Sequence, residues 1–319
     1  MQYRRLGNSG LKVSEVSLGG WLTQGRTLTD NQTTEIVRRA LDLGIILFDT
    51  ADIYNKGEAE KSLAIALRGV HRPDVVIATK CFWPMSDNPN DRGLSRKHIF
   101  ESVEASLKRL ETDYIDLMQC HRWDPETPMH EVVRAMDDLI RQGKVLYWGV
   151  SEWPAEQIAL AAGVAKELNA APPISSQPNY SMLVRRIESG VLPVSKQLGI
   201  GQIVFSPLAQ GILTGKYKPG QAAPEGTRAS DQTSNQFMQG SMNEETLQRV
   251  AKLNDFAQSL GITCGQLALG WILRDQGISS VIVGATKISQ IEENVGASGL
   301  GFGEDVWARC EAIINGEAS

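Results

Sequence analysis

The chain has 319 residues, 42% of them hydrophobic, and a formal net charge of −5 at neutral pH. This length can bury one large core, so we expect a single domain over residues 1–319. The negative charge argues against general binding of nucleic acids or of membrane surfaces, since both need a basic face. The four cysteines lie far apart without a CxxC pair, so we expect neither a metal site nor a disulfide framework, but reduced thiols as in the cytoplasm.

The N-terminal residues lack the long apolar core of a signal peptide, and no later stretch is long enough to span a membrane. We therefore expect a cytoplasmic protein without membrane insertion.

From residue 16 onward, short apolar strands alternate with amphipathic helices. A hairpin precedes them, with strands at residues 3–6 and 11–13 and a turn of glycine, asparagine and serine between.

The apolar runs predict eight strands, which end at Gly19, Phe48, Thr79, Cys120, Val150, Gln177, Phe205 and Val283. Helices are predicted to begin near Asp30, as the capping residue, and near Glu58, and to cover 95–110, 129–141, 155–168, 190–198, 244–260, 264–274, 288–297 and 304–314. Eight parallel strands alternating with helices predict a (β/α)8 TIM barrel with an N-terminal hairpin cap and extra helices near the C-terminus.

An open, doubly wound sheet is the alternative fold. Such a sheet would ordinarily carry a glycine-rich dinucleotide fingerprint after its first strand, and Gly19-Gly20-Trp21 is not one. Residues 207–243 are rich in Gly, Pro, Ser and Gln and too long for an ordinary loop, which predicts a functional or mobile segment on the active face. The helices at 244–260 and 264–274 are expected to serve packing, and the last helix to lie across the barrel or its mouth.

Four ionisable side chains fall at or just after predicted strand ends. Asp49 ends an apolar run, Tyr54 follows five residues later, Lys80 ends the third strand and His121 follows the fourth. In a barrel these strand ends share one face. A lysine ammonium lowers the pKa of a neighbouring phenol, and a carboxylate keeps that lysine charged. Tyr54 would then protonate a carbonyl oxygen while His121 orients it, which requires a hydride donor.

Each of these residues also has a purely structural interpretation. Asp49 could cap a turn, Lys80 could be a solvated strand terminus and Tyr54 a loop aromatic. His121 could be a turn histidine with its hydrogen bonds satisfied locally. All these alternatives would have to hold at once, which favours a shared site if the strand assignment is right.

The residues around these positions resemble the catalytic segments of the aldo-keto reductase superfamily. Asp49-Thr50-Ala51 with Tyr54, Thr79-Lys80 and Gln119-Cys120-His121-Arg122 carry the resemblance, which extends over nearly the whole chain. The chain also resembles the voltage-gated potassium channel beta subunits and their soluble relatives, at 80–83, 205–208, 215–217 and 283–285. The resemblance implies that Asp49, Tyr54, Lys80 and His121 form a catalytic tetrad with Tyr54 as the general acid.

The resemblance further implies NADPH as the cofactor. The residues it assigns to cofactor binding are Trp21, Asp49, Ser151, Gln177, Phe205, Ser206, Pro207, Leu208, Gln210, Gly211, Lys216, Arg228, Gly284, Thr286, Gln290, Glu293 and Asn294. Ser151 and Gln177 would hold the nicotinamide carboxamide and Phe205 would stack on its ring. The pyrophosphate would be lined by Ser206, Pro207, Leu208, Gln210 and Gly211. The adenosine ribose phosphate would be faced by Lys216, Arg228, Thr286 and Gln290, and the adenine by Glu293 and Asn294.

Three departures from the family pattern bear on the cofactor. Phe205 replaces the tryptophan typical of channel subunits, Glu152 stands where they carry arginine, and Gln290 where many reductases carry arginine. Lys216 and Arg228 suit a 2′-phosphate, or are simply solvated loop charges. The strictness of NADPH over NADH therefore stays open.

Trp21, Trp83 and Trp123 each follow a predicted strand end and are expected to wall the substrate cavity together with Tyr54 and His121. Aromatic walls favour apolar or aromatic aldehydes, although core packing is an equal alternative for Trp123. The prediction is a reductase of small carbonyl compounds; the alternative is a nicotinamide-binding regulatory subunit of the channel beta type. His121 favours turnover, because channel subunits carry asparagine there. The physiological carbonyl and the oligomeric state, a homo-oligomer included, stay open.

Overall fold

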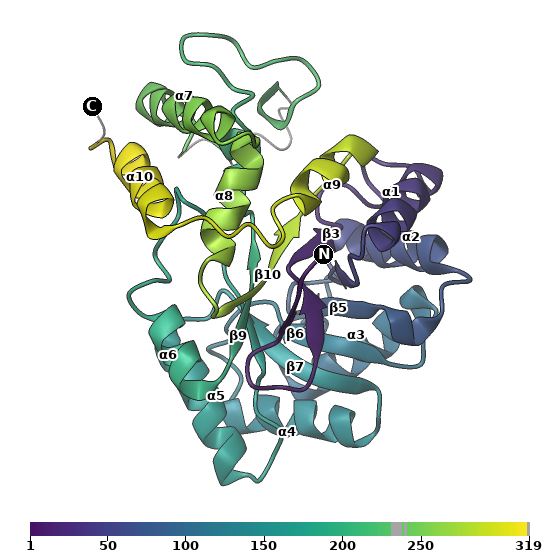
Figure 1. Cartoon of the computed structure of the whole chain (residues 1–319). Helices are drawn as coiled ribbons and strands as arrows, with labels where there is room; N and C mark the ends of the chain where they lie inside the picture. The colour runs from purple at the N-terminus through teal and green to yellow at the C-terminus, as the bar shows by residue number, and fades with distance from the viewer. Residues whose placement is uncertain (231–237, 239–240, 318–319) are drawn as a thin grey trace.

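The computed structural model describes residues 1–230, 238 and 241–317 (Figure 1). Eight parallel strands form a closed barrel in the order β10-β3-β4-β5-β6-β7-β8-β9. The strands are β3 (Val16–Gly19), β4 (Leu47–Asp49), β5 (Val76–Cys81), β6 (Ile115–Cys120), β7 (Val145–Ser151), β8 (Ser175–Gln177), β9 (Gly201–Phe205) and β10 (Ile278–Val283). The predicted TIM barrel is thus confirmed, and each observed strand ends within two residues of its predicted end.

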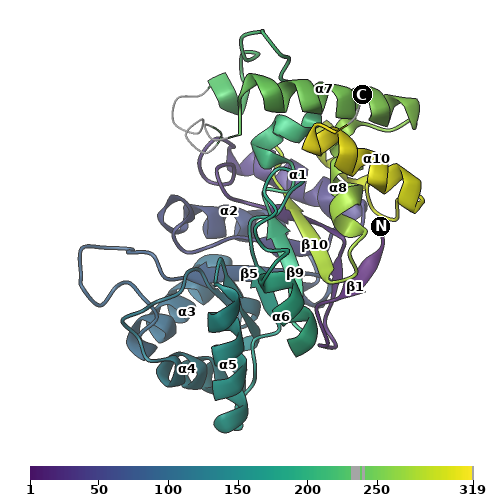
Figure 2. The same ribbon diagram turned by 90° about the vertical axis from the view of Figure 1, so that its left-hand side faces the viewer.

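Helices surround the barrel on the outside (Figure 2). They are α1 (Asp30–Asp42), α2 (Glu58–Leu67), α3 (Arg96–Leu110), α4 (Met129–Arg141), α5 (Ala155–Glu167), α6 (Val191–Leu198), α8 (Cys264–Leu273) and α9 (Ile288–Val295), with α7 (Glu244–Ser259) and α10 (Glu304–Asn315) in addition. Short 3-10 turns lie at η1 (Tyr54–Gly57), η2 (Arg72–Asp74), η3 (Ala209–Thr214) and η4 (Arg228–Ser230).

The strands are apolar because helices cover their outer faces while side chains fill the barrel interior. Every residue of β5, β6 and β10 is buried, as expected for parallel strands covered on both faces. In α4, one face carries Val132, Val133, Met136 and Leu139, all buried, which is the amphipathic spacing of a helix packed on a sheet.

The start of α1 differs from the prediction by one residue. Thr29, and not Asp30, is the capping residue: its hydroxyl accepts from the Gln32 backbone N–H, and the Gln32 side chain reaches back to the Thr29 backbone. The reason is that a capping box needs Glu or Gln three residues after the cap, and Gln32 stands three residues after Thr29.

The hairpin of β1 (Tyr3–Arg5) and β2 (Lys12–Ser14) closes the end of the barrel where the strands begin. Leu6 and Val13 pack there against interior side chains of the strands. Gly7 allows this close approach: its φ is +58°, and a Cβ in its place would lie 2.2 Å from the backbone oxygen of Gly199. The hairpin is therefore a plug at the end opposite the predicted active face.

The last helix does not lie across the mouth of the barrel, one of the two positions expected for it. It packs beside α7 and α8 on the flank (Figure 1). The reason is that α10 has an apolar face of Trp307, Cys310 and Ile313, which is buried in this position. Arg249 of α7 donates to the backbone oxygen of Ile314 (3.2 Å), and Trp271 of α8 donates to Glu311 (3.0 Å).

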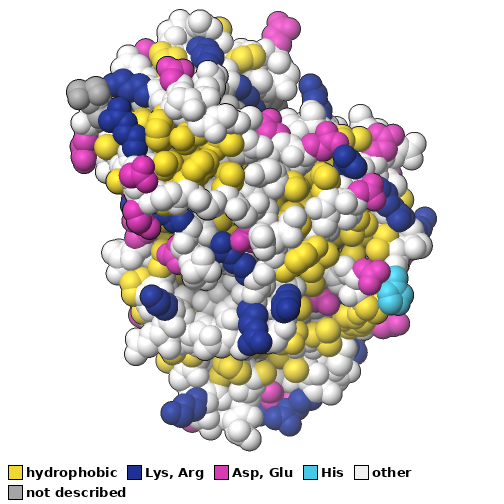
Figure 3. All heavy atoms as spheres, viewed as in Figure 1, with side chains coloured by type: hydrophobic (Ala, Val, Ile, Leu, Met, Phe, Trp, Pro, Cys, Tyr) yellow, Lys and Arg dark blue, Asp and Glu magenta, His cyan; other side chains and the backbone are white. Residues whose placement is uncertain are grey.

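In the described part of the chain, no single helix combines the length and the apolar character needed to cross a membrane. Only α7 and α8 taken together meet those criteria, and the pair is bent by 90°. Basic and acidic side chains are interspersed over the face seen in Figure 3.

Candidate active site

A buried lysine lies at the centre of the candidate site. Lys80 of β5 is 0% exposed, and its Nζ contacts Asp49 Oδ2 (2.7 Å), the Thr50 carbonyl oxygen (2.7 Å) and the Tyr54 hydroxyl (3.2 Å). Asp49 is the last residue of β4 and pairs with Ala78 of β5, so neighbouring strand ends bring the two charges together. Lys80 is therefore not a solvated strand terminus, and Asp49 pairs with a lysine instead of merely capping a turn.

The pKa of Lys80 shifts as expected, whereas that of Tyr54 does not. Burial lowers the pKa of Lys80, but the Asp49 carboxylate and Tyr54 outweigh it, so the net shift is upward and the ammonium is retained. Burial raises the pKa of Tyr54; Lys80 lowers it and Asp49 raises it. The expected lowering of the phenol pKa is thus wrong in net direction, because burial outweighs the ammonium. Tyr54 is held in its protonated, proton-donating form.

His121 follows β6 directly and is 6% exposed. Burial lowers its pKa well below the usual value, and the positive charges of Lys80 and Arg122 add to that shift, so the imidazole is neutral. Its ring centroid lies 5.8 Å from that of Tyr54 and 6.2 Å from that of Trp83. Its Nδ1 has no hydrogen-bond partner among the described residues. A neutral imidazole with an open nitrogen can donate a hydrogen bond to a carbonyl oxygen.

Ser151 and Gln177, at the ends of β7 and β8, lie beside the Asp49–Lys80 pair. Gln177 Nε2 donates to Asp49 Oδ1 (2.7 Å), and the Ser151 hydroxyl donates to the Gln177 carbonyl oxygen (2.9 Å). Asp49 is thus held by one donor on each oxygen. The Gln177 contact spans 128 residues of sequence and had no local signal that could predict it.

These residues open onto a cavity of about 1330 Å³ at the C-terminal end of the strands. Every residue predicted to bind cofactor lines it, as do Tyr54, Trp83 and His121, whereas Lys80 lies beneath its floor. Pockets for drug-sized ligands measure about 300–1,000 Å³. The cavity is therefore large enough for a dinucleotide together with a small substrate.

Trp123 does not line this cavity. Its ring packs edge-on against Trp153, 5.1 Å away, at the margin of the core. Trp123 is therefore a packing residue, which was the alternative to a place in the substrate cavity. Of the three predicted tryptophans, Trp21 and Trp83 lie in the cavity wall.

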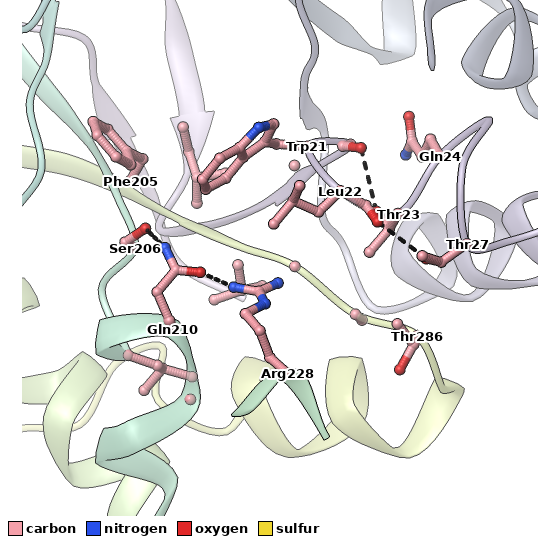
Figure 4. A pocket seen from close by; sticks show the side chains of 18 of the residues that line it. Trp21, Leu22, Thr23, Gln24, Thr27, Phe205, Ser206, Gln210, Arg228 and Thr286 are labelled. Carbon is pink, nitrogen blue, oxygen red and sulfur yellow. Dashed lines mark hydrogen bonds between the residues drawn. The ribbon is translucent and has the colours of Figure 1, made fainter. Parts of the chain in front are cut away.

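The segment after β9 bends sharply along one side of the cavity. Ser206, Ala209, Gln210 and Gly211 all have positive φ. Within this bend the amides of Ala209 and Gly211 donate to the carbonyl oxygens of Ser206 and Leu208 (2.9 Å each). Gln210 donates to the Ser206 hydroxyl (2.5 Å) and accepts from Arg228 (Figure 4). Residues 231–237 and 239–240 of the long predicted segment lie outside the described residues.

The far end of the cavity is built from the start of α9. The side-chain oxygen of Gln290 accepts from the backbone N–H groups of Thr286 (2.8 Å) and Lys287 (3.3 Å), so it organises this turn. Glu293 and Asn294 follow one helical turn later and also line the cavity, with the exposed Lys216 near Gly211.

Sequence reasoning missed most of the loop between β3 and α1. Besides Trp21, its residues Leu22, Thr23, Gln24 and Thr27 line the cavity and face the segment with Gln210 and Arg228 across it (Figure 4). Their position directly after a barrel strand was the available signal, because such loops form the active face.

A second buried network lies behind Asp49 and Lys80. Asp52 is 0% exposed and accepts from the Ser102 hydroxyl (2.9 Å) and the Ile53 backbone N–H (2.6 Å). Burial raises its pKa to about 7, helped by the nearby Glu60 carboxylate, while Arg109 opposes the rise. Glu60 itself is bound by Arg109 Nε (2.5 Å).

Asp52→Asn is expected to stabilise the protein at pH 8 and to make little difference near pH 4. The pKa is about 7 in the folded state against the usual 3.8. The free energy of unfolding of the parent therefore falls as pH rises between these two values, because the unfolded chain ionises first. At about 1.4 kcal/mol per pKa unit, the difference is on the order of 4 kcal/mol at pH 8. Urea unfolding across this pH range measures it, with the exposed Asp113→Asn as control. A difference that is independent of pH would contradict the assignment.

The comparison with known proteins decides the family. The model of the aldo/keto reductase family matches residues 15–315, nearly the whole chain. The chain belongs to the aldo/keto reductase family. Membership makes it an oxidoreductase of a family that generally binds a nicotinamide cofactor.

Three relatives of this aldo/keto reductase carry the name of a channel subunit. A probable voltage-gated potassium channel subunit beta of Arabidopsis thaliana is 45% identical over 300 residues, covering 93% of this chain and 91% of the relative. Its counterpart in Oryza sativa subsp. japonica is 44% identical with the same coverage. A putative subunit of Schizosaccharomyces pombe is 45% identical over 302 residues, covering 92% and 87%.

Proposed function

We propose that the protein reduces aldehydes or ketones to alcohols with NADPH, with Tyr54 as the general acid. The observation that carries this proposal is the Lys80 ammonium, which contacts both Asp49 and the Tyr54 hydroxyl beside a neutral His121. Membership in an oxidoreductase family and a matching cavity support it.

The cavity suits a nicotinamide dinucleotide in its chemistry. Ser206, Leu208 and Gln210 line the cavity in the bent segment after β9, and their backbone amides would face a pyrophosphate. Gly284 has open space where a Cβ would stand, so the backbone there can be approached closely. Ser151 and Gln177 would hold the carboxamide, Phe205 would stack on the ring, and Trp21 and Asp49 would complete that end. When bound, the cofactor supplies the hydride.

The protein's own residues handle the proton and the position of the carbonyl. Tyr54 donates its hydroxyl proton to the carbonyl oxygen, and the Lys80 ammonium, 3.2 Å away, stabilises the phenolate that remains. Asp49 keeps that ammonium in place. His121 donates a hydrogen bond from its neutral ring and so orients the carbonyl oxygen toward Tyr54. Trp21 and Trp83 exclude water from the substrate's apolar part.

A panel of aldehydes and ketones, assayed by the loss of NADPH absorbance, tests the proposal. We expect turnover with aromatic aldehydes. Cofactor binding without turnover of any carbonyl would contradict it and favour the second candidate, a regulatory subunit that holds a nicotinamide. The names of the three relatives are the observation behind that candidate.

NADPH is expected to bind more tightly than NADH. Lys216 and Arg228 both line the cavity, and we expect them to bind the 2′-phosphate, since a charge-assisted hydrogen bond contributes about 1.5–3 kcal/mol. Lys216→Ala or Arg228→Ala should therefore weaken NADPH binding by about 10-fold to 150-fold and barely change NADH binding. Titration of both cofactors, followed by protein fluorescence, measures this. Lys218→Ala, an exposed lysine outside the cavity lining, is the control. Equal losses for both cofactors would show that these cations do not bind the 2′-phosphate.

A further inference from the structure

Arg122 is a cation in the cavity wall that forms no ion pair with a carboxylate of the described residues. Arg122 follows His121, is half-buried and lines the cavity. Its Nη1 donates to the His121 carbonyl oxygen (2.6 Å), and its guanidinium lies over the Trp83 ring, 5.5 Å from the centroid. These two contacts fix the group at the substrate end, and within the described residues it forms no ion pair.

Glu152, the carboxylate that acts on the charge of Arg122, is already engaged by other groups. Glu152 forms an ion pair with Arg186, and its Oε1 accepts from the Asn179 backbone N–H (2.6 Å). It attracts Arg122 without reaching ion-pair contact, and it does not line the cavity. Glu152 thus moderates the positive charge of Arg122 without occupying its donors, and those that do not bond the His121 carbonyl oxygen can bind a ligand.

The charges around the substrate end sum to one positive charge. Asp49 neutralises Lys80, His121 is uncharged and Glu152 neutralises Arg186. Arg122 remains. Burial lowers its pKa, which indicates that the charged form is incompletely compensated there. Arg122 is also close enough to Tyr54 for each to affect the other's charge, so a substrate bound at Tyr54 can extend to it.

We propose that Arg122 binds a carboxylate on the substrate, so that the preferred substrates are carbonyl compounds that also carry a carboxylate. This inference rests on the proposed reductase function. A guanidinium presents planar paired donors that match a carboxylate. A phosphate monoester brings about −1.5 to −2 charges and would exceed the single positive charge available. Trp83, stacked with Arg122, would hold the apolar part between the two groups.

The test compares 4-formylbenzoate with its methyl ester, which has the same ring and aldehyde but no charge. We expect kcat/KM to favour the carboxylate by about 10-fold or more. Arg122→Gln should bring this ratio close to one. Glu152→Gln should raise it, because the variant removes the competing negative charge and keeps an oxygen for the Asn179 N–H. The ratio cancels any effect of either substitution on His121, since both aldehydes need that residue equally.

Arg96→Gln is the matched control, because Arg96 also lies over an aromatic ring, that of Phe100, but outside the cavity. Its ratio should equal that of the parent. An active parent with equal kcat/KM for the two aldehydes would overturn the inference and leave the reductase function intact. Calorimetric titration of both aldehydes into protein with NADP+ gives a readout without turnover. Tighter, Arg122-dependent binding of the carboxylate would support the inference even if no aldehyde were reduced, and equal binding would overturn it.

Discussion

Tyr54→Phe is expected to lower kcat/KM for carbonyl reduction by about 100-fold or more while NADPH affinity stays within about twofold. The variant keeps the ring but removes the hydroxyl that lies 3.2 Å from Lys80 Nζ. No other hydroxyl is placed beside both the ammonium and His121 in the described residues, so a replacement donor would have to come from water. Steady-state assays of NADPH consumption with an aromatic aldehyde measure the loss, and fluorescence titration measures cofactor binding.

Tyr3→Phe is the matched control for this variant. The Tyr3 hydroxyl donates to the Gly44 carbonyl oxygen (3.0 Å) far from the cavity, so its loss should leave the aldehyde kinetics unchanged. If Tyr54→Phe reduced aldehydes at the parental rate, Tyr54 would not be the acid and the proposed mechanism would fail.

Lys80→Met is expected to destabilise the protein by about 3–5 kcal/mol. Removing one partner of a buried ion pair leaves the other charge uncompensated in a low-dielectric interior. Asp49 is 4% exposed and, among the described residues, its carboxylate would keep only the Gln177 amide as a donor. Lys80→Met combined with Asp49→Asn should recover much of this loss, because the double variant has no buried charge and keeps an oxygen for Gln177. Denaturant unfolding of the two single variants and the double variant measures the coupling.

A surface pair provides the control. Lys61 and Glu58 also form a lysine–carboxylate pair at 2.7 Å, but both side chains are about half exposed, so Lys61→Met should cost about 1 kcal/mol or less. Equal effects of Lys80→Met and Lys61→Met, or a double variant as unstable as Lys80→Met, would show that the buried pair is not coupled in this way.

The sequence by itself determined the barrel and the set of residues at its active end. Apolar runs bounded by polar residues mark buried strands, and helical spacing of apolar residues marks the layer around them, so both patterns are local. Eight strands that alternate with helices, without the glycine fingerprint of an open sheet, favour closure, and in a closed barrel Asp49, Lys80 and His121 share one face. To predict that these three residues converge, the strand ends had to be located only to within one or two residues.

Only the tertiary structure decided what these side chains do to one another. The pKa of Tyr54 rises because burial outweighs Lys80, and burial is a property of the assembled site. The Gln177–Asp49 bond, the packing of Trp123 on Trp153 and the engagement of Glu152 by Arg186 depend on strand register and loop paths. Local sequence patterns carry no record of such contacts, since each joins residues from different elements. For the same reason, the lack of an ion pair at Arg122 within the described residues became visible only when their carboxylates had been placed.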